Sequence, residues 1–312
     1  MCSKVIKFCY MFNCRLEPTY DAEERQLISD LFNGGAMRNL NPNSIIVSIN
    51  DKYPIDVKCI QSFSSGQFLS EIAMDAFLEL CNVRDLQLVT AFNEVNVDKS
   101  GYIPRIGCTY LNSQFSSLLM QSDFSVDRFT AHDLVQELIQ KQTFRKSYRT
   151  FIPVLWTGDH RNEWLLIIMD TSNHTINFIF TKFSVVVESS VSEDEKAALT
   201  VSLRGKLEII LSQINLPPDQ EEQKVEQQQQ IEWTFVNYFN SSLEEQSADP
   251  HRRIPLSHYQ GISEKAGSGI YIMHTIECEY FDAPLFAPLE HDWINIRRNL
   301  AYSIIKEQLM IS

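Results

Sequence analysis

The chain has 312 residues, of which 44% are hydrophobic, so it is long enough to bury a substantial core. Its net charge of −13 argues against a direct nucleic-acid partner, because binding to phosphates requires clustered Lys and Arg side chains. No apolar run approaches the roughly 20 residues of a membrane span, so we expect no membrane association. These bounds favour a globular protein whose partners are other proteins.

The seven cysteines give information about the compartment and about metal binding. They form no CxxC pair and have no spacing partnered by histidine, so we expect neither a metal site nor a cofactor. Cys59 and Cys81 lie in apolar patterns that are typical of buried core thiols. An odd count without regular spacing fits a reducing compartment. The start of the chain resembles a signal peptide only faintly, because Lys7 interrupts it, so we expect an intracellular protein, nuclear or cytoplasmic.

The first predicted elements follow an N-terminal extension of residues 1–44. Within that extension, an apolar pattern after an acidic start predicts a helix over residues 21–33. Residues 44–49 then predict a strand, and a turn at residues 50–51 leads to a second predicted strand at residues 57–60. The main domain is therefore expected to cover residues 45–312.

Two amphipathic helices are predicted in the first half of this domain. Residues 64–67 are expected to cap the first of them. Its apolar positions recur every three or four residues, at Phe68, Leu69, Ile72, Ala73, Ala76, Phe77 and Leu80. Thr130 and Asp133 form a capping box, which predicts that the second helix starts at Thr130.

The clearest strand signals lie in the middle of the chain. Residues 151–156 and 164–169 are nearly continuous apolar runs, as expected of strands that are buried on both faces. Residues 170–174 predict a turn, and residues 175–180 predict the next strand. We therefore expect a central sheet in this region.

The last third of the chain mixes helices with one strand. Residues from about 219 to 230 are rich in Glu and Gln and are interpreted as a low-complexity insertion. Strands alternate with helices along the chain and no internal repeat is present, which favours the α+β class. The elements predicted here are a long helix after a capping box at Ser192 and Glu195 and before Pro217, a strand over residues 231–239, a helix starting at Ser268, and an amphipathic helix over residues 293–309.

Three segments, in the same order along the chain, resemble the proteases specific for SUMO and other ubiquitin-like proteins. Residues 66–71 resemble the start of the family's W-L-N/S-D helix, and residues 152–180 resemble its central strands with an H-W pair and a later Asp. Trp233 followed by residues 267–272 resembles the final element, in which the family has D-C-G. The following helix with Arg297 resembles the family's last helix. The resemblance implies a papain-like or adenain-like cysteine-protease fold, with a central mixed β-sheet flanked by helices.

The resemblance also implies a Cys-His-Asp triad, and all three of its positions differ in this chain. The nucleophile position holds Ser268, the histidine position holds Glu163, and the aspartate position holds Phe180. For the oxyanion glutamine, Gln260 is a displaced candidate. A serine hydroxyl without an adjacent base is a much weaker nucleophile than a cysteine thiolate. A carboxylate with a pKa near 4.3 is poorly suited to act as that base, so we expect no functional catalytic residue at these positions.

Other residues offer alternative assignments for the missing groups. His160 lies four residues before Trp164 and could supply the imidazole after a loop rearrangement, although a turn residue is expected. Cys108 follows a glycine and could be a stray nucleophile, although a structural thiol is expected. His274 is on the helix that starts at Ser268 and is expected to pack against a neighbouring element.

The resemblance further implies a groove that holds the C-terminal tail of a ubiquitin-like protein. Its candidate lining residues are Phe68, Trp164, Gly267 and Gly269. The alternative for the two aromatic residues is that both simply belong to the core.

These observations lead to three functional hypotheses. The first is a pseudoprotease: a non-catalytic domain that binds or scaffolds proteins as a subunit of a complex, with SUMO or another ubiquitin-like modifier as a candidate partner. The second is a cysteine-type peptidase that removes SUMO or a related modifier, in which Ser268 stands at the cysteine position. The third is a purely structural subunit that docks a partner or another copy through the apolar residues 5–12 and the helix at 21–33, although these segments are expected to cover the domain's own core.

Overall fold

The computed structural model describes ten stretches of the chain and the isolated residues Ala22, Gln26 and Asp30. The stretches are residues 41–64, 67–97, 106–121, 126–141, 143–157, 162–180, 193–214, 233–237, 267–281 and 290–306. The three isolated residues are helical, which agrees with the helix predicted over 21–33. Residues 5–12, His160, the insertion at 219–230 and Gln260 lie outside the described residues.

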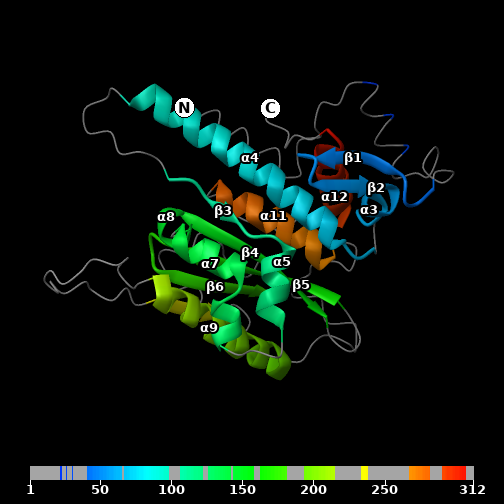
Figure 1. The fold of residues 1–312 in the computed structure, drawn as a ribbon. Helices are drawn as coiled ribbons and strands as arrows, with labels where there is room; N and C mark the ends of the chain where they lie inside the picture. Colours follow the sequence, from blue (N-terminus) through cyan, green and yellow to red (C-terminus); the bar gives the residue numbers. More distant parts are fainter. Residues whose placement is uncertain are drawn as a thin grey trace, which may run out of the picture.

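The centre of the fold is a five-stranded sheet in the order β3-β4-β5-β6-β7 (Figure 1). Its strands are β3 (Thr109–Tyr110), β4 (Arg149–Thr157), β5 (Asn162–Asp170), β6 (Thr175–Phe180) and β7 (Thr234–Asn237). The three middle strands pair antiparallel, whereas β3 and β7 run parallel to their neighbours. The sheet is therefore mixed, and the predicted strands at residues 151–156, 164–169 and 175–180 are confirmed.

Helices cover both faces of this sheet, so alternate residues of β5 enter different hydrophobic clusters. Leu166 and Ile168 pack in one cluster with α4 (Glu71–Asn96) and α11 (Ser268–Tyr280). Their neighbours Leu165 and Ile167 pack in the other cluster. That second cluster is formed with α5 (Ser113–Met120), α7 (Asp133–Gln140) and α9 (Glu193–Ile214), on the opposite side of the sheet in Figure 1. This arrangement confirms the α+β class.

The first described elements form a small hairpin beside the start of α4. Strand β1 (Ile45–Ile49) pairs with β2 (Tyr53–Asp56), and the last helix, α12 (Glu290–Ile305), packs nearby (Figure 1). The strand predicted at residues 57–60 is wrong, because these residues belong to the short helix α3 (Val57–Gln61). The cause is Asp56, whose side chain accepts a hydrogen bond of 2.6 Å from the Cys59 N–H and caps the helix.

The predicted starts of two helices are also wrong. Helix α4 begins at Glu71 because the Ser70 hydroxyl accepts the Ala73 N–H at 3.2 Å, so residues 64–67 are not its cap. Thr130 is the last residue of α6 (Val126–Thr130) rather than a cap. Helix α7 instead uses His132, whose ring nitrogen accepts the Leu134 N–H at 3.2 Å, and α8 (Thr143–Lys146) follows it.

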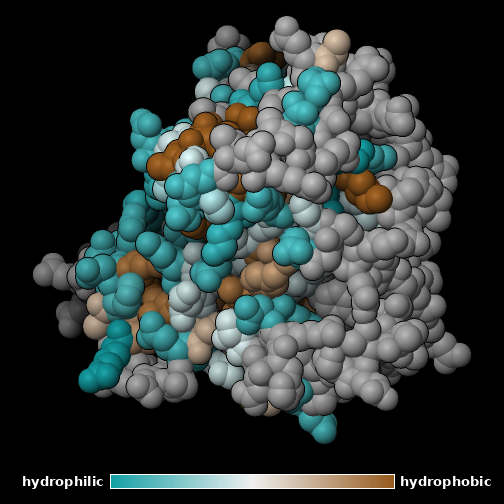
Figure 2. All heavy atoms as spheres, turned by 90° about the vertical axis from the view of Figure 1, so that its right-hand side faces the viewer, coloured by the Kyte–Doolittle hydropathy of each residue, from teal (hydrophilic) through white to brown (hydrophobic). Residues whose placement is uncertain are grey.

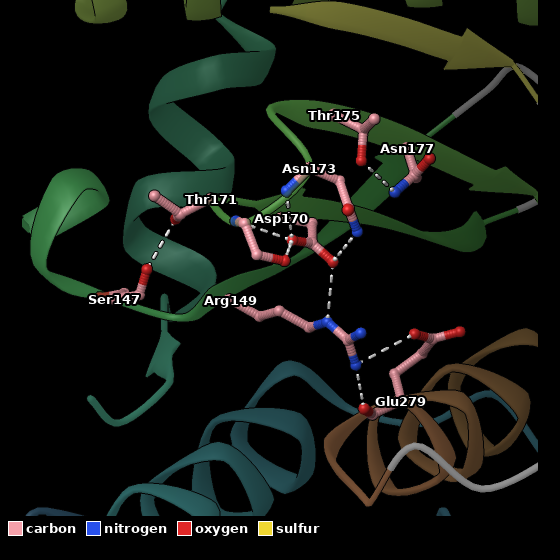
Figure 3. A network of polar contacts seen from close by, with 9 residues as sticks. Ser147, Arg149, Asp170, Thr171, Asn173, Thr175, Asn177 and Glu279 are labelled. Atoms are coloured by element: carbon pink, nitrogen blue, oxygen red, sulfur yellow. Dashed lines mark hydrogen bonds and ion pairs between the residues drawn. The ribbon is translucent and has the colours of Figure 1, made fainter. Parts of the chain in front are cut away.

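A polar network fixes the C-terminal end of α11 to the sheet (Figure 3). Arg149, at the start of β4, donates to the Asp170 carboxylate at the end of β5, with an Nε–Oδ2 distance of 3.2 Å. The same guanidinium donates to the backbone carbonyl of Glu279 and lies 3.5 Å from its carboxylate. Asp170 also accepts the backbone N–H groups of Ser172 and Asn173, at 3.0 and 3.1 Å. Helix α11 is therefore anchored at the end of β5, and its N-terminal end reaches the start of that strand.

Candidate functional site

The N-terminal end of α11 begins with a sharp turn at Gly267. This residue is the N-cap and has φ 67° and ψ 145°, in the region that favours glycine. The next residue, Ser268, is 5% exposed, and its Oγ accepts the backbone N–H of Trp164 at 2.9 Å. The predicted helix start at Ser268 is thus confirmed, and its hydroxyl lies against the beginning of β5.

A second glycine allows α11 to approach its neighbours closely. A Cβ atom added to Gly269 would lie 2.6 Å from Cβ of Leu69 and 2.9 Å from Cδ1 of Trp164. A Cβ added to Gly267 would lie 3.7 Å from the carbonyl oxygen of Gln67. The segment that precedes α4 therefore runs alongside the turn that carries Ser268.

Two aromatic side chains complete this part of the site. The rings of Phe68 and Trp164 are stacked, with centroids 6.3 Å apart and planes 7° from parallel. The indole N–H of Trp164 donates to the Leu69 carbonyl at 3.1 Å. Trp164 is 1% exposed, whereas Phe68 is 39% exposed, so the core alternative applies to Trp164 and not to Phe68. The four candidate groove residues are thus close together.

Glu163 and Phe180 lie near the same end of the sheet. In the strand register, Phe180 pairs with Leu165, and Glu163 lies two residues earlier on β5. Because strand side chains alternate, Glu163 and Phe180 share the face that is covered by α5, α7 and α9. Both are buried, and Glu163 directly precedes the residue whose N–H contacts Ser268. The three positions that the resemblance assigns to the triad therefore all lie near the start of β5, with Glu163 and Phe180 on the sheet face opposite to the one that α11 covers.

The contacts of the three histidines with described side chains are with residues other than Ser268. His132 caps α7, and the ring of His174 contacts Trp233 with centroids 5.7 Å apart. His274 is buried against the ring of Trp293, and burial lowers its pKa to about 4. Among the described residues, no imidazole is hydrogen-bonded to Ser268.

The cysteines with described positions are free thiols. Cys59 and Cys81 are buried, as the sequence predicts, and burial raises the pKa of the Cys59 thiol to about 11. The backbone N–H of Cys108 donates to the Asp85 carboxylate at 2.8 Å, which fixes the loop that contains Cys108. Within the ranges that the structure describes, no three His, Cys, Asp or Glu residues are grouped so that they could hold a metal ion. In those same ranges, none of the helices has the length and apolar character needed to cross a membrane.

Comparison with known proteins identifies the fold. No protein family model matches the sequence, and no curated protein matches it. Among solved structures, the SUMO protease Ulp1 with its catalytic cysteine oxidised to a sulfonic acid has a TM-score of 0.56 and 14% identity, over 94% of this chain and 99% of that chain. The C-terminal Ulp1 protease domain in complex with Smt3, the yeast ortholog of SUMO, gives 0.52 at 14% identity, over 95% and 99%. The Ulp1-like SUMO protease catalytic domain of Chaetomium thermophilum gives 0.53 at 14% identity, over 95% and 93%.

The chain has the fold of the Ulp1-like SUMO proteases. The resemblance stated from the sequence is confirmed at the level of the fold. In this SUMO-protease-like domain, the segment 67–70, the start of β5 and the turn at Gly267 surround Ser268.

One residue beside the turn at Gly267 was not predicted as part of the candidate site. Arg297 on α12 is 2% exposed, and its guanidinium donates to the carbonyls of Phe63 and Ser64 at 3.1 and 2.9 Å. Its Nη2 lies 2.8 Å from the point that a Cβ on Gly267 would occupy. Burial lowers the Arg297 pKa to about 10, so the group stays a cation at neutral pH beside the positive end of α11. The sequence signal that could have identified Arg297 is its position as a charged residue in the apolar stripe formed by Trp293, Leu300 and Ile304.

Proposed function

We propose that this chain is a non-catalytic SUMO-protease-like domain that binds proteins, and that SUMO or another ubiquitin-like modifier is its partner at the inherited groove. The observation that carries the proposal is the surroundings of Ser268. Its hydroxyl oxygen accepts the Trp164 N–H, while the adjacent position 163 holds a buried glutamate and position 180 holds a phenylalanine. A fold that keeps its groove without these chemical groups is suited to binding rather than to cleavage.

The chemistry at each of the three positions supports this proposal. A serine nucleophile needs a base to remove its proton, whereas the alternation along β5 places Glu163 on the sheet face opposite to Trp164 and α11. The Phe180 side chain has no atom that could accept a hydrogen bond from an imidazole, so a histidine at position 163 would also lack its carboxylate partner. The loss of triad members costs on the order of 10⁴- to 10⁶-fold in serine proteases.

The surface features support recognition at a narrow site. Figure 2 shows that the hydrophobic atoms on the described part of one face occur in small groups among hydrophilic atoms. Exposed large apolar side chains occur in several segments of the chain, such as Ile45 and Val201, and two of them, Phe68 and Ile72, lie four residues apart at the start of α4. We assign the surface beside the exposed Phe68 and the turn that carries Ser268 to a modifier tail.

The test combines binding with an attempt to restore catalysis. The wild-type chain is titrated with mature SUMO and related modifiers by calorimetry, and a Ser268→Cys variant is incubated with a modifier precursor and with a tail-directed electrophilic probe. We expect binding by the wild-type chain, and neither cleavage nor labelling by the single variant. Cleavage by Ser268→Cys would establish the alternative function, a peptidase with serine at the cysteine position.

The triple variant Ser268→Cys, Glu163→His, Phe180→Asp serves as the positive control for the chemistry. Its melting curve has to be recorded as well, because an aspartate at the buried position 180 is expected to reduce stability. Absence of binding to every modifier tested would reject the proposed ligand.

A role as a subunit of a larger complex, in the nucleus or the cytoplasm, follows from the same proposal. A binding domain without catalytic activity acts by holding its partners together. Affinity purification of the full chain from cells, followed by mass spectrometry and fractionation, should recover a defined set of partners. Recovery of the chain alone would contradict this role.

A further inference from the structure

Helix α4 carries one stripe of core-type positions along most of its length. The positions are Phe77, Cys81, Arg84, Leu88, Ala91 and Val95. Their spacing alternates between four and three residues, so they lie on one side of the helix. In the first half of α4 this side is inside the core, where Phe77 and Cys81 are fully buried. The stripe therefore continues beyond the part of α4 that the core uses.

The second half of the stripe is open to solvent. Leu88 is half-buried, Ala91 is exposed, and Val95 is 63% exposed. Leu86 and Val97, in the same part of the chain, are also mostly exposed. Figure 1 shows this half of α4 extending beyond β3 and α11. Exposed apolar side chains that are gathered in this way are typical of an interaction surface.

The charge of α4 restricts what can bind at this surface. The helix carries five acidic side chains and one basic side chain, and the basic one, Arg84, is already paired with Glu277. Glu94 is exposed and lies three residues after Ala91, next to the open part of the stripe. A fitting occupant is therefore apolar and has positive charges beside its apolar groups.

The chain itself contains a segment of this chemistry at its start. Residues 5–12 are apolar except for Lys7, and Lys4 and Arg15 lie on either side of them. Residues 1–16 contain no acidic side chain, although the net charge of the whole chain is −13. The segment 5–12 thus complements the open half of α4 in both apolar character and charge.

The connection to this segment is long enough to reach α4. With residues 21–33 in a helix and the rest of residues 13–40 extended, it spans up to roughly 70 Å. Helix α4 has 26 residues and is about 39 Å long. The connection also keeps the segment at a high local concentration, which favours contact within one chain over contact between chains.

We propose that residues 5–12 dock on the C-terminal half of α4, with their apolar side chains against Leu88, Ala91 and Val95 and their positive charges near Glu94. The N-terminal segment is then an internal ligand of the domain. This docking does not depend on the proposed binding of a modifier, because the segment before α4 borders the turn that carries Ser268, whereas the docking surface is at the opposite end of α4.

Crosslinking in the full chain tests the docking directly. Cys9 lies in the middle of the segment, so Val95→Cys is compared with the control Val201→Cys, whose valine is 70% exposed on α9. Both proteins also carry Cys2→Ser and Cys14→Ser, which leaves Cys9 as the only cysteine among the first 16 residues. Mild oxidation should join Cys9 to the introduced cysteine about 10-fold faster in Val95→Cys than in Val201→Cys.

The disulfides are mapped by mass spectrometry on a mixture of isotope-labelled and unlabelled chains. A crosslink within one chain supports the docking. Equal rates in the two proteins would overturn it. A crosslink in Val95→Cys that joins labelled to unlabelled chains would also overturn it, because a second copy would then be the occupant of the surface.

Limited digestion with trypsin gives a second measurement without any crosslink. The double variant Ala91→Gln, Val95→Gln makes the open stripe polar, and Ala198→Gln, Val201→Gln makes the same replacements at exposed positions of α9. We expect cleavage after Lys7 to be about 3- to 10-fold faster in the first variant, because less apolar surface holds the segment, and unchanged in the second. Equal cleavage in the wild type and both variants would contradict the docking.

Discussion

The absence of a side chain at Gly269 allows α11 to pack closely against Leu69 and Trp164 at the candidate site. A Cβ at this residue would lie 2.6 Å from Leu69, which is closer than real Cβ contacts, so Gly269→Ala has to push α11 away from its neighbours. We expect the variant to lose about 1–3 kcal/mol of unfolding free energy, less a small gain in helix propensity. Urea unfolding followed by circular dichroism measures this change.

The matched control is Gly205 in α9, where an added Cβ would meet nothing within 4 Å. Gly205→Ala is expected to stabilise the protein by about 0.5–1 kcal/mol, because alanine favours the helix and restricts the unfolded chain. Equal effects of the two substitutions would show that Gly269 is not required for close packing.

His274 leads to a prediction about pH. Burial lowers its pKa in the folded protein to about 4, compared with 6.5 for the ordinary group. Below pH 6.5 the unfolded chain therefore binds a proton that the folded protein does not bind. Stability due to this group is fully present above pH 6.5 and is lost as the pH falls towards 4, by up to roughly 3 kcal/mol. Urea unfolding at a series of pH values measures this loss.

His274→Leu should remove this part of the pH dependence while leaving the rest unchanged. The exposed His132 serves as the control, as His132→Asn keeps an acceptor for the cap of α7. If the stability of His274→Leu falls as steeply between pH 6.5 and 4 as that of the wild type, the buried imidazole is not responsible.

At the scale of single residues, the sequence was informative where a pattern was local. The strand period places Glu163 and Phe180 on one face, and the small-residue turn places Ser268 at a helix start. Arg297 was not predicted as a site residue because its partners, Phe63 and Ser64, are more than 200 positions away in the chain. No local period encodes a contact of that kind.

Between elements, a buried ion pair joins α4 to α11. Arg84 donates to both carboxylate oxygens of Glu277, at 2.6 and 2.8 Å, and neither side chain is more than 2% exposed. Glu277→Gln leaves the buried Arg84 without its counter-charge, so we expect a loss of about 3–5 kcal/mol in unfolding free energy. Because α11 carries Ser268 at its other end, this contact also helps to orient the groove.

The exposed pair of Arg204 and Glu208 on α9 is the matched control, since its side chains are 52% and 49% exposed. Glu208→Gln should cost less than about 1 kcal/mol. The double variant Arg84→Met, Glu277→Leu should recover much of the stability that the single change loses, because no charge is left buried. A double variant that is less stable than Glu277→Gln would contradict this explanation. Chemical denaturation curves of the four proteins provide the measurement.

Element types were predicted well, and element starts less well. The apolar runs of β4 and β5 are unambiguous because both faces of the sheet are covered. The start of a helix depends on which of several possible capping residues is used. Asp56 caps α3, whereas Ser64 and Ser70 are both possible caps before α4. Residues 57–60 form part of α3 instead of the predicted strand because the Asp56 carboxylate accepts the Cys59 N–H. Only the tertiary fold decides between such local alternatives.

For the molecule as a whole, the alternation of elements indicated the α+β class, and the ordered motifs that resemble the SUMO proteases were enough to predict the fold, although identity to the solved SUMO proteases is only 14%. The reason is that the fold depends on the alternation of apolar runs and amphipathic helices, which tolerates many substitutions. Activity depends on a few groups instead. A residue such as Ser268 can therefore change the chemistry while the turn at Gly267 and the helix after it remain.

The domain boundary predicted after residue 44 can be tested through the backbone that lies just before β1. The Ser44 carbonyl accepts the Val57 N–H at 3.1 Å, and the Pro42 carbonyl accepts the Lys58 N–H at 3.0 Å. These donors are in the first turn of α3, where no partner within the helix exists. A chain that starts at Ile45 loses both acceptors, so it should be less stable than one that starts at Asn41, by about 1–3 kcal/mol. Thermal and urea unfolding of the two truncated proteins measure the difference, and equal stability would support the boundary at residue 44.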